Sequence, residues 1–220
     1  MEPLWSLQGF KCDFRVEMAS LFPVYSEPHA EMCPRCHYFD YFQIDSFRWS
    51  NRGNQISDFI GCDVTRVVRE EVADDLIARF SGIMKREFHF LDNPRCYNTY
   101  NSREKRIWLP YTGPELCELI LTHEISLLPQ STIISNGCCP ECGREEYIGI
   151  KGLKWPSKRT PCPIRSPKSG LFIAASEVEN LDFFRPVGTC FCLCRDSVRQ
   201  FIEKKAYTNA FFWDVGAIVQ

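Results

Sequence analysis

The sequence predicts an α+β fold in which two cysteine-bearing turns come together and two similar modules accompany them. The cysteine tetrads at 33–36 and 139–142 both read Cys-Pro-x-Cys. In the segments at about 56–112 and 171–220, apolar residues at helical spacing are combined with short apolar runs. Each segment is therefore predicted to form a strand-helix-strand module, the first as an insertion and the second at the C-terminus.

The composition is typical of a globular protein. The chain has 220 residues, 45% of them hydrophobic, so it can bury a core as one large domain or two small ones. A formal charge of −2 gives no overall attraction to nucleic acid or anionic lipid. No basic segment precedes an apolar run at the N-terminus, and no later run reaches the roughly 18 residues of a membrane helix. We expect a cytoplasmic protein with no membrane partner.

The spacing of the tetrad cysteines predicts a metal site. Two Cys-x-x-Cys turns that face each other supply the four sulfurs of a tetrahedral Zn²⁺ site. We expect one structural zinc ion, bound by Cys33, Cys36, Cys139 and Cys142, with no open position for catalysis. Because the two pairs are far apart in the chain, the residues between them would be an insertion into a zinc-ribbon domain that spans 1–170.

Other readings of the cysteines stay open. His37 follows the first tetrad and Cys138 precedes the second, so either side chain is a candidate substitute ligand. The tetrads could also be separate redox dithiols, although a redox pair normally opens a helix and the aromatic run 37–42 favours a strand. The chain has 13 cysteines, and we expect the others to be reduced and mostly in the core. Three of them alternate with apolar residues and would share one face of a strand: Cys190, Cys192 and Cys194.

Between the tetrads the sequence predicts two helices and a strand. Apolar residues repeat at helical spacing along 63–80, and a strand would follow at 87–91. A second helix would run from Glu115 to about Leu127, with His123 on its apolar face as a core histidine.

The C-terminal module repeats this order. A strand is predicted at 191–194, and Asp196-Ser197 would begin an amphipathic helix that ends near Ala206. The segment 210–215 is predicted to be the last strand, and its three adjacent aromatic residues favour a core position on at least one face.

The paired tetrads, the module between them and the segment 181–185 before the last strand-helix-strand together resemble the double-CXXCG-motif family of myxobacterial and related bacterial proteins. The resemblance covers roughly residues 30–218, and one position departs from it, because His37 stands where the family has Gly. The family includes immunity proteins of swarming-inhibition toxin systems. The resemblance therefore implies a protein that binds a cognate protein toxin and neutralises it by stoichiometric occlusion.

No catalytic motif supports an enzyme. His123-Glu124 begins like a zinc-protease helix, but Leu127 occupies the position of the second histidine. The sequence also has no Walker loop, no GxSxG turn and no GxGxxG turn. We expect the protein not to be an enzyme.

A basic segment follows the second tetrad at 151–168 and contains no acidic residue. We interpret it as a solvated connector stiffened by proline, since the whole chain is slightly acidic. Two functional alternatives are contact with a partner protein and contact with nucleic acid, the latter in a zinc-ribbon regulator. The candidate contact residues are Lys151, Lys154, Trp155, Lys158 and Arg159.

Overall fold

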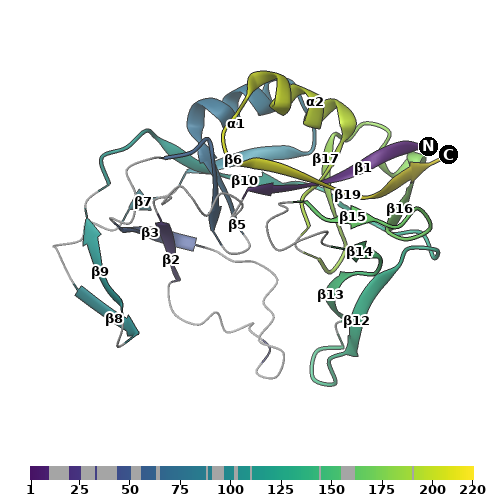
Figure 1. Ribbon diagram of the computed structural model, residues 1–220, viewed down its shortest axis with the longest axis horizontal. Coiled ribbons are helices and arrows are strands. Elements are labelled where there is room, and N and C mark those ends of the chain that lie inside the picture. Colours follow the sequence, from purple (N-terminus) through teal and green to yellow (C-terminus); the bar gives the residue numbers. More distant parts are fainter. Residues whose placement is uncertain are drawn as a thin grey trace.

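The computed structural model is α+β, as predicted, and consists mostly of strands with two α-helices in its described part (Figure 1). The described residues are 1–9, 20–25, 33, 44–50, 56–62, 65–87, 89–90, 97–101, 104–109, 111–143, 145–154, 162–189 and 191–220. Among them, no helix is long and apolar enough to cross a membrane.

The largest sheet joins the two ends of the chain. Its strand order is β11-β17-β18-β1-β19-β16. The strands are β1 (Glu2–Gly9), β11 (Glu124–Ile125), β16 (Leu171–Ala174), β17 (Phe183–Pro186), β18 (Leu193–Arg195) and β19 (Ala210–Val219). β1 is antiparallel to both neighbours and places Glu2 opposite Ile218, so the two termini lie together (Figure 1). The sheet therefore takes strands from both sides of the predicted domain boundary at 170/171.

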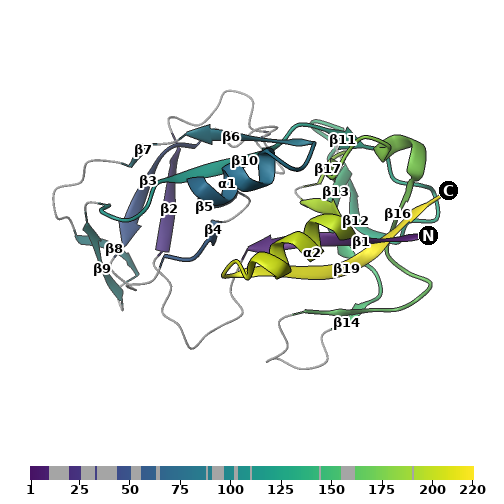
Figure 2. The same ribbon diagram turned by 90° about the horizontal axis from the view of Figure 1, so that it is seen from above.

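A four-stranded antiparallel sheet has the order β4-β5-β10-β6. Its strands are β4 (Phe59–Cys62), β5 (Thr65–Arg69), β6 (Ile83–Glu87) and β10 (Leu116–Leu121). The first helix, α1 (Glu70–Ile77), follows β5 directly. The second helix, α2 (Asp196–Lys205), lies beside α1, and Lys205 Nζ is 2.6 Å from Asp75 Oδ2 (Figure 2).

Two of the predicted helices are corrected by this sheet. The segment 63–80 is helical only over Glu70–Ile77, and its first part is strand β5. The predicted helix at 115–127 is absent, since this segment contains β10 and β11, and His123 lies exposed between them rather than in the core. Successive residues of β5 and β10 are buried on both faces, as Val67 and Val68 are, and this two-sided burial resembles a helical pattern in the sequence. The described residues of the segment predicted as a strand at 87–91 are extended, since Glu87 ends β6 and β7 comprises His89–Phe90; residues 88 and 91 lie outside the described part.

The C-terminal elements follow one another in the predicted order as β18, α2 and β19. β18 begins at Leu193, two residues after the predicted start at 191, and β19 continues beyond the predicted end to Val219. Ala206 closes α2 in the left-handed conformation with φ 54°. Cys192 and Cys194 are buried as expected, whereas Cys190 lies outside the described residues.

Two hydrophobic cores lie on opposite faces of the largest sheet. Phe183 and Phe184 are adjacent on β17 and fully buried, and they point into different cores because strand side chains alternate. The core on the side of Phe183 also contains Leu76 of α1 and Ile202 of α2, so it lies under both helices. The core on the side of Phe184 includes Ile150, the last residue of strand β13 (Glu145–Ile150), which anchors the base of a hairpin.

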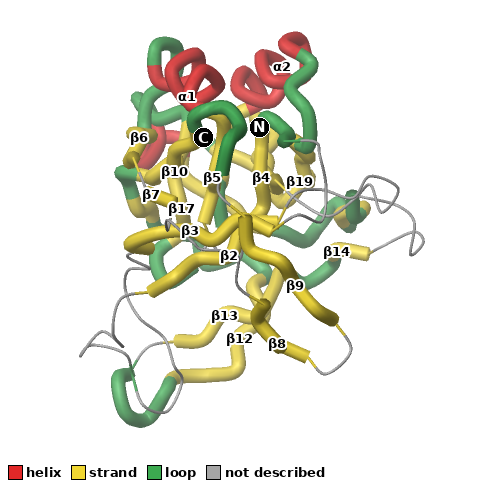
Figure 3. Tube along the Cα trace, turned by 90° about the vertical axis from the view of Figure 1, so that its left-hand side faces the viewer, coloured by secondary structure: helices red, strands yellow, loops and turns green. Residues whose placement is uncertain are grey.

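The remaining strands form a third sheet and two hairpins. The third sheet contains β2 (Ser20–Tyr25), β3 (Ile44–Ser50), β7, β8 (Tyr97–Asn101) and β9 (Glu104–Leu109). The hairpins are β12 (Ile133–Cys138) with β13 (Glu145–Ile150) and β14 (Leu153–Lys154) with β15 (Ile164–Arg165). Figure 3 shows both helices at one end of the molecule and the β12–β13 hairpin at the other. A short 3-10 helix, η1 (Ala175–Val178), follows β16.

The close approach of the turn after α1 to β17 leads to a prediction about Gly82. Gly82 has φ 86°, and a Cβ atom there would lie 1.9 Å from the carbonyl oxygen of Phe183. We expect Gly82→Ala to lower the free energy of unfolding by about 3 kcal/mol, because backbone strain and overpacking add. Gly137 is the matched control, since it has φ 90° but an open surrounding, and Gly137→Ala should cost about 1 kcal/mol. Urea unfolding measures both values, and equal losses would contradict the role of the Phe183 contact.

Candidate metal centre

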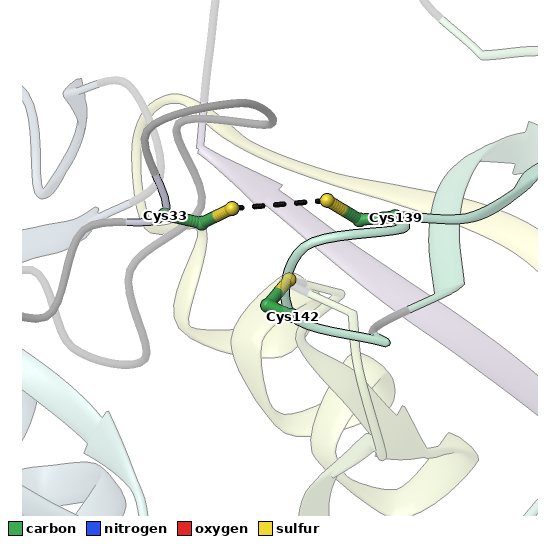
Figure 4. A group of neighbouring side chains, drawn as sticks. All are labelled: Cys33, Cys139 and Cys142. Carbon is green, nitrogen blue, oxygen red and sulfur yellow. Dashed lines mark hydrogen bonds between the residues drawn. The ribbon is translucent and has the colours of Figure 1, made fainter.

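Three of the four predicted ligands lie together in the structure. The sulfur atoms of Cys33, Cys139 and Cys142 are all within 4.8 Å of one another. Figure 4 shows the side chains of Cys33 and Cys139 pointing toward each other from separate segments, with Cys142 beside them. Since Cys33 and Cys139 are 106 positions apart, the tertiary fold creates this cluster. A metal ion could be held by these three side chains.

The distance between two of the sulfurs fits shared coordination of one ion. Cys33 Sγ and Cys139 Sγ are 3.7 Å apart. Two thiolates at about 2.3 Å from a tetrahedral zinc ion are about 3.8 Å from each other. A disulfide would require about 2.05 Å between the sulfurs. The observed separation therefore matches a pair of metal ligands and excludes a bond between these two atoms in this structure.

The turn at the tip of the β12–β13 hairpin positions Cys139 and Cys142. The backbone N–H of Gly143 donates to the carbonyl oxygen of Cys139 at 2.7 Å and closes the turn. Gly143 has φ 69°, in the region that favours glycine. The space around it is open, so the backbone conformation rather than crowding explains why glycine is present here. The local sequence Cys-Pro-Glu-Cys-Gly thus specifies a turn that places both sulfurs on the same side.

Backbone groups of this turn also favour the thiolate form of Cys139. The N–H groups of Cys142 and then Glu141 donate to its sulfur and lower the pKa of the Cys139 thiol below its ordinary value, since they stabilise negative charge. A thiolate is the form that binds a metal ion. In contrast, burial raises the pKa of the Cys192 and Cys194 thiols, which is expected of core cysteines.

The alternatives for the ligand set are partly resolved. Cys138 is exposed and is not a member of the cluster, although it is adjacent to Cys139. Cys36, the fourth predicted ligand, and His37 both lie outside the described residues, as does the strand predicted at 37–42. Cys33 and Cys139 are buried, whereas Cys142 is exposed, so the cluster lies at the surface with two of its sulfur-bearing residues covered.

The basic segment is only partly described. Lys151 and Lys154 are exposed, whereas Trp155, Lys158 and Arg159 lie outside the described residues. Arg165 is half-buried, and its Nε is 2.8 Å from Asp214 Oδ1. Sequence reasoning did not single out this ion pair, because no local pattern relates two residues that are 49 positions apart.

Comparison with known proteins adds no relative: no protein-family model, curated protein or solved structure matches the chain. The resemblance to the double-CXXCG-motif family therefore stays a prediction from the cysteine motifs and the order of the elements.

The cluster predicts which cysteines are needed for metal binding. We expect the purified protein to contain about one metal ion per chain, and Cys33→Ser, Cys139→Ser or Cys142→Ser to reduce this to about none, because each removes a clustered sulfur. Cys138→Ser is the matched control and should keep the ion, since Cys138 is exposed and lies outside the cluster. Elemental analysis of protein purified without chelator measures the content. A metal-free wild-type protein, or equal loss in Cys138→Ser, would contradict this assignment.

Proposed function

We propose that the cluster is a structural zinc site, completed by Cys36 as the fourth thiolate. The observation that carries this proposal is the 3.7 Å approach of the Cys33 and Cys139 sulfurs across the fold. Sulfur ligands select zinc among the common structural metal ions, and four thiolates saturate its tetrahedral coordination. Such a site has no open position for substrate, so its contribution is to folding rather than to catalysis.

Zinc at this position would connect two distant segments of the chain. It would join the segment that carries Cys33 to the tip of the β12–β13 hairpin, whose base is anchored by the buried Ile150. Binding of the ion contributes directly to the free energy of folding, because the unfolded chain has no preformed site. The protein would thus present a rigid surface around the hairpin.

We further propose that the protein is a bacterial immunity protein that binds a cognate toxin in the cytoplasm. This proposal rests on the paired tetrads and on the segment order that resembles the double-CXXCG-motif family. A preformed surface would act by occlusion, with one molecule of the protein for each toxin molecule. A zinc-binding framework fits this role, because rigid partners lose less conformational freedom when they bind.

A nucleic-acid-binding regulator is the second candidate. The exposed Lys151 and Lys154 next to the cysteine hairpin favour it. Against it, the guanidinium of Arg165 is engaged by Asp214, and the whole chain has a formal charge of −2. Arg165 therefore adds little to a nucleic-acid-binding surface, and the immunity function is the better supported proposal.

The immunity function predicts protection by direct binding. Cells that express the toxin encoded beside this gene should grow when the protein is co-produced and stop growing when it is absent. The two proteins should co-purify in equal molar amounts, since an inhibitor without turnover must match its target. Cys139→Ser should lose protection together with its zinc, and Cys138→Ser should protect like the wild type. If the neighbouring gene encodes no toxin, or if the pair neither co-purifies nor alters growth, the immunity proposal fails and the zinc proposal stands.

A further inference from the structure

The β14–β15 hairpin has two faces of different character. Its register places Leu153 opposite Arg165 and Lys154 opposite Ile164. In an antiparallel pair, residues directly opposite each other point to the same face. Leu153 and Arg165 are both half-buried, whereas Lys154 is exposed and Ile164 is 63% exposed. One face is thus directed into the protein and the other into solvent.

The inward face holds the hairpin firmly against the largest sheet. Arg165 Nε donates to Asp214 Oδ1 of β19 at 2.8 Å, and its Nη1 donates to the carbonyl oxygen of Ser169 at 2.8 Å. Leu153 packs against the core that contains Phe184. Leu153 and Arg165 alternate along their strands with the exposed Lys154 and Ile164. The hairpin that carries these two exposed side chains is therefore anchored to the rest of the protein.

Two more exposed lysines lie in the turns that adjoin the two strands of the hairpin. Lys151 lies in the turn before β14 and Lys168 in the turn after β15, and both are exposed. The two turns are joined by a hydrogen bond from Ser166 N–H to the carbonyl oxygen of Gly152 at 3.0 Å. Within the described part of the chain, none of Lys151, Lys154 and Lys168 forms an ion pair, and no acidic residue occurs in the sequence from 151 to 176. This positive surface occurs on a chain with a formal charge of −2.

We propose that the outward face of the β14–β15 hairpin, Lys154 and Ile164 flanked by Lys151 and Lys168, is a docking surface for an acidic patch of a partner protein. This inference deepens the proposed immunity function and rests on it, since the partner would be the toxin. The lysines select an acidic partner by charge complementarity and accelerate association. Figure 2 shows β14 at the periphery of the molecule, where a partner can reach it.

Ile164 favours a protein partner over nucleic acid. An isoleucine that is 63% exposed gains free energy when an apolar surface covers it. A phosphate backbone offers no such surface, and base stacking uses flat aromatic or guanidinium groups rather than a branched aliphatic one. An exposed apolar residue paired with a lysine, as Ile164 is with Lys154, fits a protein interface, in which apolar and polar groups lie side by side.

The test measures binding of the purified full-length protein to the purified product of the neighbouring gene, by surface plasmon resonance at several salt concentrations. We expect Ile164→Asp to raise Kd at least about tenfold, mainly through faster dissociation. Lys154→Glu should lower the association rate at low salt and flatten its salt dependence. The matched controls are Met84→Asp, at a half-exposed apolar position of β6, and Lys204→Glu, at an exposed position of α2. Each control should change Kd by less than about twofold, as expected of positions outside an interface.

Thermal unfolding and zinc content equal to the wild type establish that each variant is folded. If the wild type binds and both hairpin variants bind equally well, the docking surface is wrong and the immunity function stands. If the wild type does not bind the neighbouring product, both proposals fail. If the wild type instead binds an oligonucleotide duplex, and Lys154→Glu weakens this binding while Ile164→Asp does not, the face is a nucleic-acid surface and the inference is overturned.

Discussion

The pairing of β1 with β18 and β19 is the constraint on which the rest of the structure depends. Residues 2–9 hydrogen-bond to strands from the last part of the chain and lie between them in the largest sheet. Without β1 this sheet would be split into two parts. The cores on both of its faces would also lose a buried side chain, since Leu4 and Leu7 of β1 are buried in different cores. The first and last residues of the chain are thus parts of one structural unit.

This pairing also shapes the metal centre. The chain leaves the largest sheet after Gly9 and returns to it at β11, and Cys33 lies on this long excursion, whereas Cys139 and Cys142 come after it. Closing a long loop costs entropy that grows only slowly with loop length, so one strong contact can hold it. With the proposed zinc ion bound, the cysteine cluster would provide such a contact, because it would join the excursion to a hairpin whose base packs in the core that contains Phe184.

The hairpins β12–β13 and β14–β15 both pack against the core that contains Phe184 and both reach the surface, but in different ways. In the first hairpin, the base packs in the core and the tip carries two clustered cysteines. In the second hairpin, neighbouring residues of β15 have different roles. Arg165 anchors the hairpin through its hydrogen bond to Asp214, and the side chain of Ile164 is exposed to solvent. Both hairpins follow closely in the chain, so the proposed zinc site and the proposed docking surface depend on the same core.

The sequence alone determined the features that depend on local chemistry. The Cys-Pro-Glu-Cys-Gly turn requires a glycine at positive φ and two cysteines at fixed spacing, and both requirements are visible in consecutive residues. The helix at Asp196–Lys205 and the strand after it were equally predictable, because α2 has one buried face and one solvated face.

Only the tertiary structure decided the features that depend on neighbours far away in the chain. β5 and β10 were predicted to be helical because their residues are buried on both faces, and this burial is created by the elements packed around them. The approach of Cys33 to Cys139 was expected from their residue types, but its geometry results from the fold between them. The ion pair of Arg165 with Asp214 had no signal in the sequence, since side-chain partners at such separation are chosen by strand packing rather than by local pattern.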